Sequence, residues 1–350
     1  MFRIGRWEVH EPAVLAPMAG VTDRPFRMLC RRLGAGHAVG EMLTSQRHLW
    51  GSRKTSHRID HRGEPGPIAV QIAGVDPQAM ADTAREAIDR GAQIVDINMG
   101  CPAKKVCDRL AGSALMRDER LALAIVDAVV AACASHGVPV TLKMRTGWDA
   151  AQRNAPALAL AAESAGVAMV AVHGRTREQR YSGQAEFDTI AEVKSRLRIP
   201  VVANGDIDSP RKAAAVLAAS GADALMIGRA AQRRPWIFRE IAHFLETGEL
   251  LAPPLVAEVR RLLLEHLQDH YALYGEHIGE LSARKHIGWY VRQLPGGEPF
   301  RDAMNRLTDT ESQLAAVAAY FDNLGATMDR LPQIAPDTGD AAMMSSVETA

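Results

Sequence analysis

The segment 96–118, DINMGCPAKKVCDRLAGSALMRD, holds the residues best suited to chemistry. It places Asn98 and Cys101 directly after an apolar run, and Gly100 and Pro102 bend the chain around the cysteine. A thiol with a pKa of about 8 to 9 is mostly protonated at neutral pH, so Cys101 could deliver a proton to carbon as a general acid. An amide such as Asn98 can both donate to and accept from a planar heterocycle.

The cysteines give no sign of a metal site or of a disulfide framework. The spacing of Cys101 and Cys107 matches no common zinc motif, and no second Cys or His pair lies nearby. We expect Cys107 and Cys133 to be packing residues in the core. Four cysteines in 350 residues, with no apolar run of membrane-spanning length and no secretory signal, predict reduced thiols, no membrane and a cytoplasmic protein.

Eight short apolar runs alternate with amphipathic, alanine-rich segments, which predicts a (β/α)8 TIM barrel of α/β class. A doubly wound sheet would give similar strands, but it usually needs fewer, and no G-x-G-x-x-G follows the first run. The runs are 14–18, 37–43, 67–73, 93–99, 138–144, 167–173, 199–205 and 222–228.

Polar residues close each run, and the active sites of such barrels are built at these strand ends. Any one of them also fits the ordinary reading of a polar residue where a strand meets solvent. The set comprises Met18, Glu41, Gln71, Asn98, Lys143, His173, Asn204 and the pair Gly228 and Arg229.

The last two loops and Lys143 point to a phosphate-bearing cofactor. Loops after the seventh and eighth strands of a barrel often bind phosphate, and the chain has Asn204, Gly205 and Asp206 in one and Arg229 in the other. A buried Lys143 would be costly without an anionic partner. It could stabilise charge at the N1/C2 edge of a flavin, or it could pair with a carboxylate inside the barrel.

A second unit follows the barrel, which we assign to residues 1–250. Residues 254–325 have helical periodicity and predict a small all-helical domain, and we expect 326–350 to be a disordered tail. The net charge is zero. Residues 1–253 nevertheless carry 33 Lys and Arg against 27 Asp and Glu, whereas the remainder carries 8 against 14. Within that acidic remainder, Arg284 and Lys285 form a basic exception, and a polyanion could meet them there.

The motifs resemble those of the bacterial tRNA-dihydrouridine synthases, and most closely their B branch. The likeness covers about residues 3–325. Its segments are LAPMAGVTDRPFR (15–27), VQIAG (70–74), DINMGCPAKKV (96–106), LAGSALM (110–116), VTLKMRTGW (140–148), VHGRTREQRYSGQAE (172–186), VVANGDI (201–207), ADALMIGRAAQRRPWIF (222–238) and ARKHIGWY (283–290).

The resemblance implies FMN at the barrel mouth, reduction by NADPH or NADH, and a uridine flipped out of the tRNA D-loop. Hydride would pass from flavin N5 to C6 of the uracil, and Cys101 would protonate C5. Asn98 and Arg145 would meet the uracil or its surroundings, and the helical domain with Arg284 and Lys285 would bind tRNA. The residues implied for FMN are Pro17, Met18, Gln71, Lys143, His173, Asn204, Asp206, Gly228 and Arg229.

The B-branch likeness further suggests the seventeenth nucleotide of tRNA as the target, and we expect a monomer. Two alternatives are weighed against this reading. A flavin barrel that reduces a free pyrimidine would need no basic helical domain. A catalytically silent RNA-binding barrel would have no reason to keep Cys101, Lys143 and His173 together.

Overall fold

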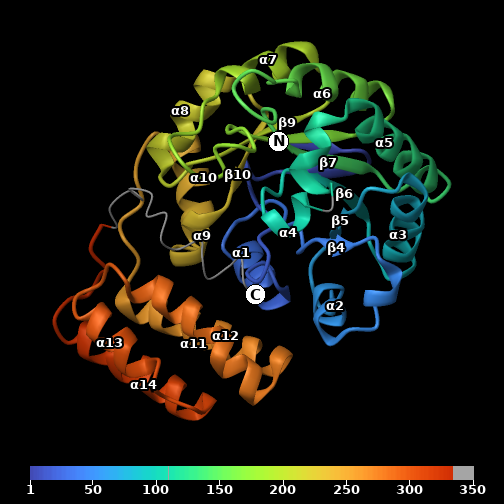
Figure 1. Ribbon diagram of the computed structural model, residues 1–350. Helices are drawn as coiled ribbons and strands as arrows, with labels where there is room; N and C mark the ends of the chain where they lie inside the picture. The colour runs from blue at the N-terminus through green and yellow to red at the C-terminus, as the bar shows by residue number, and fades with distance from the viewer. Residues whose placement is uncertain (109, 334–350) are drawn as a thin grey trace.

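Eight parallel strands form the wall of a barrel in the computed structural model, which describes residues 1–108 and 110–333 (Figure 1). Their spatial order is β3-β10-β9-β8-β7-β6-β5-β4. The strands are β3 (Ala13–Leu15), β4 (Leu43–Thr44), β5 (Ala69–Ala73), β6 (Ile94–Met99), β7 (Val140–Arg145), β8 (Met169–His173), β9 (Val201–Asn204) and β10 (Ala224–Ile227). The predicted (β/α)8 barrel is confirmed.

The predicted strand 37–43 is not continuous. Ala38 bridges Leu15 of β3 and Val39 bridges Ala69 of β5, so these two residues close the barrel between its two edges. Between these two residues and β4, the Glu41 carboxylate accepts hydrogen bonds from the Gly20 N–H and from Arg58.

Helices cover the outside of the sheet, and most begin at a capping residue. Asp23, Asp76, Asp118 and Ser209 each accept a backbone N–H of the first turn, which satisfies a donor that has no partner within the helix. The covering helices are α1 (Arg24–Arg32), α2 (Arg53–Arg58), α3 (Pro77–Asp89), α5 (Glu119–Ala134), α6 (Ala155–Ser164), α7 (Asp188–Arg196), α8 (Pro210–Ser220) and α10 (Ile237–Thr247). Shorter helical segments are η1 (Arg47–Leu49), α4 (Lys104–Cys107), η2 (Gly112–Arg117) and α9 (Arg229–Arg233).

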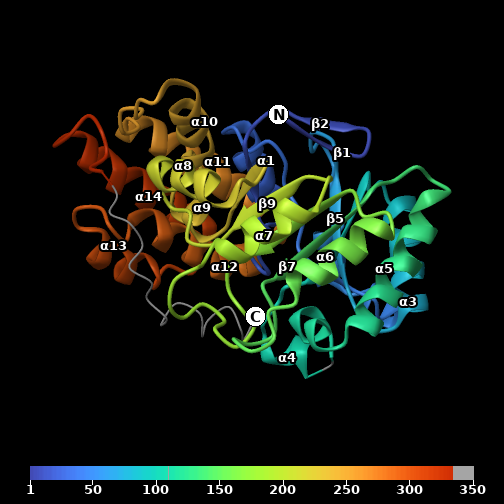
Figure 2. The same ribbon diagram turned by 90° about the horizontal axis from the view of Figure 1, so that it is seen from above.

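An amino-terminal hairpin, which the sequence did not predict, closes one end of the barrel. Its strands are β1 (Phe2–Ile4) and β2 (Trp7–Val9). Phe2 and Ile4 pack with Ile94 and other residues at the starts of the wall strands. Figure 2 shows this hairpin at the end of the barrel opposite α4. Side chains at the carboxyl ends of the strands therefore lie at the remaining, open mouth.

Four helices follow the barrel and lie beside it, with α11 against α1 and α12 against α9 (Figure 1). They are α11 (Val256–Tyr274), α12 (Glu276–Val291), α13 (Gly297–Met304) and α14 (Thr310–Gly325). None of the helices in the described residues is long and apolar enough to cross a membrane.

The expectation of a disordered tail from 326 onward is wrong for its first part. The Leu331 N–H bonds to the Pro254 carbonyl, and the Leu331 side chain is buried in the core. An apolar side chain in this position anchors residues 326–333 against the start of α11. The rest of the predicted tail lies outside the described residues.

Candidate active site at the barrel mouth

The carboxyl ends of β5 to β9 bring the predicted side chains into one row. Neighbouring strands are parallel and in register, so residues at the same level face the same region of the mouth. The paired residues at this level are Gln71 with Asp96, Asn98 with Lys143, and His173 with both Arg145 and Asn204.

A buried hydrogen-bond network fixes the two amides of the row. The Asn98 Nδ2 donates to Gln71 Oε1 at 2.7 Å, and Gln71 Nε2 donates to Asp96 Oδ2, also at 2.7 Å. The Thr141 hydroxyl donates to the other Asp96 oxygen at 2.6 Å. Burial raises the pKa of Asp96, against the hydrogen bonds from Thr141 and Gln71. The network holds the Gln71 and Asn98 side chains in a single orientation.

The loop that carries Cys101 is held by its backbone. Asn98 Oδ1 accepts the N–H groups of Gly100 and Cys101 at 3.1 and 3.0 Å. The Arg145 Nε donates to the Gly100 carbonyl at 2.8 Å, and the Ser113 hydroxyl donates to the Cys101 carbonyl at 2.9 Å. The main chain on both sides of Cys101 is thus fixed.

The Cys101 side chain is partly exposed at the mouth, whereas Cys107 and Cys133 are buried, as expected of packing residues. Burial of the thiol group raises the pKa of Cys101, and the nearby Arg145 and Lys143 lower it only in part. The thiol is therefore protonated at neutral pH, which is the state that a proton donor requires.

Lys143 bonds to an amide rather than to a carboxylate. Its Nζ donates to Asn204 Oδ1 at 3.1 Å, and Asn204 Nδ2 donates to the Met226 carbonyl at 2.7 Å. Burial lowers the pKa of Lys143 to about 8, Arg145 acts in the same direction, and Asp96 opposes them. An anion that approached Lys143 would relieve this penalty.

Arg145 holds two loops of the mouth together, and its expected place near the uracil stays a prediction. Its side chain is almost fully buried, and its Nη1 donates to the carbonyls of Thr176 and Arg180, both at 2.8 Å. Together with the bond from Nε to Gly100, these contacts join the Cys101 loop to the loop after β8. Burial lowers the pKa of Arg145 to about 10, so the guanidinium stays charged at neutral pH.

The loops after β9 and β10 meet at Asp206. Its carboxylate accepts from Arg175 at 2.6 and 2.9 Å, from Arg229 at 3.2 Å and from the Ala185 N–H at 2.8 Å. Burial raises the pKa of Asp206, but the hydrogen bonds from Arg175 outweigh it and lower that pKa. Gly205 adopts a φ of +124°, where L side chains are strained. Asp206 thus orients two arginines beside a close-approach glycine.

His173 is buried beside these cations. Burial lowers its pKa well below the ordinary value, and Arg145 and Lys143 lower it further, so the imidazole is neutral. Its Nε2 lies 3.4 Å from Arg175 Nη1. A neutral ring in this position can offer one donor and one acceptor.

The other end of the row is formed by β3 and β10, which pair in parallel up to Leu15 and Ile227. Pro17 and Met18 follow the first strand, and Gly228 follows the second. The Gln232 side chain donates to Met18 Sδ at 3.6 Å. The predicted residues Pro17, Met18, Gly228 and Arg229 therefore border one side of the mouth.

Arg284 and Lys285 are partly exposed, and each also forms hydrogen bonds within the chain; their expected contact with tRNA stays a prediction. Lys285 Nζ donates to the Gly20 carbonyl, and the Gly20 N–H donates to Glu41 at 2.8 Å. Burial lowers the pKa of Lys285. Arg284 bonds to Glu280 and, at 3.1 Å, to the Leu307 carbonyl. Lys285 links α12 to the loop after β3.

Sequence reasoning missed Asp96, Thr141 and Ser113. Asp96 lies two residues before Asn98 on the same strand, so the two-residue period of a strand places both on one face. That period was the signal that could have found it. Ser113 had no comparable signal, because its partner, the Cys101 carbonyl, is a backbone group.

A comparison with protein families matches residues 14–324 to dihydrouridine synthase (Dus). The chain belongs to the dihydrouridine synthase family. Every residue of the mouth described above lies within the matched range.

Two curated members of this family are similar over nearly the whole chain. The tRNA-dihydrouridine synthase B of Xanthomonas axonopodis pv. citri is 57% identical over 340 residues, which cover 97% of this chain and 100% of that protein. The tRNA-dihydrouridine synthase B of Pseudomonas syringae pv. tomato is 59% identical over 319 residues, covering 91% and 94%.

Solved structures with a similar fold are more distant in sequence. An old yellow enzyme homologue from Zymomonas mobilis aligns with a TM-score of 0.50 at 15% identity, over 72% of this chain and 93% of that one. A 2-naphthoyl-CoA reductase complex aligns with a TM-score of 0.52 at 13% identity, over 69% and 51%. At these sequence identities the two structures support the barrel fold of this chain and nothing about its function.

Proposed function

We propose that this protein is an FMN-dependent tRNA-dihydrouridine synthase that reduces the C5–C6 double bond of a D-loop uridine, with NADPH or NADH as reductant. The observation that carries the proposal is the Cys101 loop, fixed by Asn98 and Arg145 above the strand ends that hold Lys143. Family membership supports the same reaction, since close relatives carry the name tRNA-dihydrouridine synthase B.

The donor set at the mouth fits FMN. Lys143 offers a half-buried ammonium whose hydrogen-bond acceptor in the described residues is the neutral amide of Asn204, which suits a ring edge that gains negative charge. Arg229 and the backbone around Gly205 and Gly228 suit a phosphate, because glycine lets main-chain N–H groups approach an anion. Further residues that would hold the cofactor are Pro17, Met18, Gln71, His173, Asn204 and Asp206, the last through its hold on Arg229.

Bound FMN, once reduced, would supply a hydride for C6 of the uracil. The chain supplies the proton: the Cys101 thiol, kept neutral by burial, gives its proton to C5. Asn98 and Arg145 keep the thiol in place through the loop backbone. Solvent or a later proton transfer must then restore the thiol before the next turnover.

The rest of the proposal concerns how the protein binds tRNA. Extruding a base costs a few kcal/mol, which stacking in the site and backbone contacts must offset. The helices α11 to α14 lie beside the barrel, and Lys285 of α12 reaches the loop after β3, so this segment would give part of that surface. Likeness to the B branch favours the seventeenth nucleotide of tRNA as the target, and a monomer would suffice.

The proposal is tested with purified protein, FMN and NADPH, using unmodified tRNA and free uridine as separate substrates. Mass spectrometry of nucleosides should detect dihydrouridine from the tRNA at a rate far above that from free uridine. Equal or faster reduction of the free nucleoside would favour the small-molecule reductase. A protein that binds tRNA but reduces neither substrate would be the silent RNA-binding barrel.

A further inference from the structure

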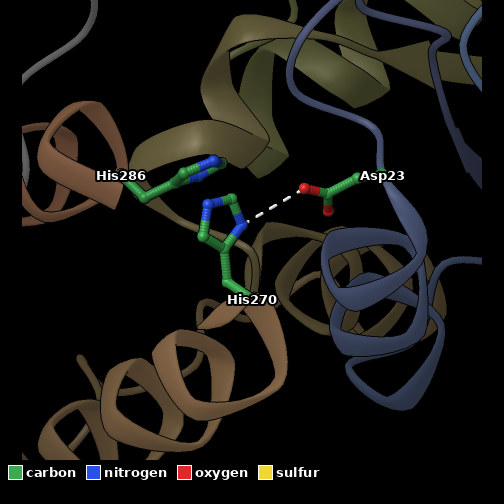
Figure 3. A group of neighbouring side chains, drawn as sticks. All are labelled: Asp23, His270 and His286. Atoms are coloured by element: carbon green, nitrogen blue, oxygen red, sulfur yellow. Dashed lines mark ion pairs between the residues drawn. The ribbon is translucent and has the colours of Figure 1, made fainter. Parts of the chain in front are cut away.

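A buried group of one carboxylate and three imidazoles lies where the helical segment meets the barrel. Asp23 begins α1, His266 and His270 lie on α11, and His286 lies on α12. All four side chains are buried. Figure 3 shows Asp23, His270 and His286 pointing toward one another from three helical segments.

His270 presents its Nδ1 to Asp23. The Ser282 hydroxyl donates to the Ile278 carbonyl at 2.7 Å, so it must accept from His270 Nε2, which is also 2.7 Å away. His270 Nδ1 lies 3.3 Å from Asp23 Oδ2. Either a proton on Nδ1 or a cation shared by the two atoms would bridge this distance.

His286 and His266 are buried without partners. In the described residues, neither nitrogen of either ring has a hydrogen-bond partner. The two rings are 4.9 Å apart between centroids, and His286 lies 5.2 Å from His270. Buried imidazole nitrogens without a partner are destabilising, and a bound ion would relieve this cost.

One oxygen of Asp23 faces the histidines. Its Oδ1 caps α1 by accepting the Phe26 N–H at 3.0 Å, whereas Oδ2 lies 3.3 Å from His270 Nδ1. Tyr274 also forms a side-chain hydrogen bond with this carboxylate. A buried, charged carboxylate needs a cation close by.

We propose that Asp23, His270 and His286 bind a divalent cation of the zinc class, with water in the fourth position. Imidazole and carboxylate together suit Zn²⁺ and its transition-metal neighbours. Ligands at about 2.0 to 2.1 Å in a tetrahedron stand roughly 3.4 Å from one another. The Asp23 to His270 distance of 3.3 Å meets this value, and all the ligand atoms of the three residues lie within 4.8 Å of one another.

The surroundings supply what a metal site needs beyond its ligands. The Ser282 contact holds His270 in the tautomer that presents Nδ1, which is how outer partners orient ligating histidines. A groove of about 710 Å³ reaches His266. Its lining carries three carboxylates, Glu8, Glu11 and Asp269, against the two guanidinium groups of Arg31 and Arg32. The ion would join α11 and α12 to α1 and so hold the helical segment against the barrel.

The test measures metal binding to the purified full-length protein after dialysis against a chelator. With Co²⁺ as the probe, we expect about one ion per chain and the intense ligand-field bands of a four-coordinate site, at wavelengths beyond flavin absorption. Zn²⁺ should displace Co²⁺ and raise the thermal midpoint. His286→Gln and Asp23→Asn should each lower the affinity at least tenfold, and asparagine keeps the cap of α1.

His277→Gln, an exposed histidine on the same helix, is the matched control and should bind as the wild type does. Circular dichroism of each variant verifies that it is folded. The proposal is overturned if the wild type takes up far less than one ion per chain, because Asp23 and His270 then form a simple ion pair. It is also overturned if folded His286→Gln binds as tightly as the control.

Discussion

Cys101 owes its position to side chains that never touch its sulfur. Asn98 and Arg145 bond to the main chain at Gly100 and Cys101, so the thiol is presented by the loop. Asn98 in turn is fixed by Gln71, and Gln71 by Asp96. A change at Asp96 would therefore reach the reacting atoms through three hydrogen bonds.

The lowered pKa of Lys143 predicts how the affinity for FMN depends on pH. This pKa is lowered to about 8 in the protein alone, and a bound anion would raise it. Affinity for FMN should be greatest below pH 8 and fall by up to about tenfold per pH unit as pH rises above 8, because one proton is then taken up on binding. Flavin fluorescence titrations across this range test it. Lys143→Met should bind FMN more weakly and without that slope, and an unchanged slope in the variant would remove Lys143 from the cofactor site.

At the scale of elements, the turn into η2 supports the Cys101 loop. Gly112 has a φ of +62°, and a Cβ there would come within 2.8 Å of the Cys101 carbonyl oxygen. Gly112→Ala should cost about 1 to 2 kcal/mol of backbone strain and also displace Cys101, which slows dihydrouridine formation. Gly137→Ala is the control, because Gly137 has nearly the same φ of +61° but nothing within 4 Å.

Stability and product formation of the two variants are compared side by side. Gly112→Ala should have both the lower thermal midpoint and the lower rate, because its Cβ meets the Cys101 carbonyl in addition to the strain that both variants share. Equal rates in both variants would show that the Cys101 loop tolerates the added atom.

The strand-end residues could be predicted because parallel strands bring their carboxyl ends to one edge. Gln71, Asn98, Lys143, His173 and Asn204 all lie there, as the apolar runs indicated. The pattern could not predict the hydrogen-bond partners of these side chains. The partners depend on how the strands pack in the barrel, where Lys143 donates to Asn204 and Asp96 accepts from Gln71 and Thr141.

At the scale of the whole molecule, the helical segment is tied to the loop after β3. A basic residue in an acidic helical stretch is normally interpreted as a surface cation. The sequence did not indicate that α12 packs against the barrel and partly buries the Lys285 side chain. The same kind of packing orders Leu331, where composition suggested disorder. Such long-range contacts produce no periodic pattern in the sequence, so they could not be predicted from it.

Lys285→Met should loosen this tie. The variant loses the bond to the Gly20 carbonyl, so we expect a lower thermal midpoint and a KM for tRNA raised several-fold, with flavin reduction by NADPH nearly unchanged. Lys212→Met, on the exposed surface of α8, serves as the control. A variant that matches this control in KM would show that the contact with Gly20 does not set the tRNA-binding surface.

The most direct test of the account removes the proposed proton donor. Cys101→Ala should keep FMN and its reduction by NADPH, yet form dihydrouridine in tRNA about 10² to 10⁴ times more slowly than the wild type. The readout is dihydrouridine mapped by nucleotide in tRNA from cells that lack the gene and carry either version. We predict that the wild type restores the modification at the seventeenth nucleotide and that Cys101→Ala does not; equal restoration by both would contradict the account.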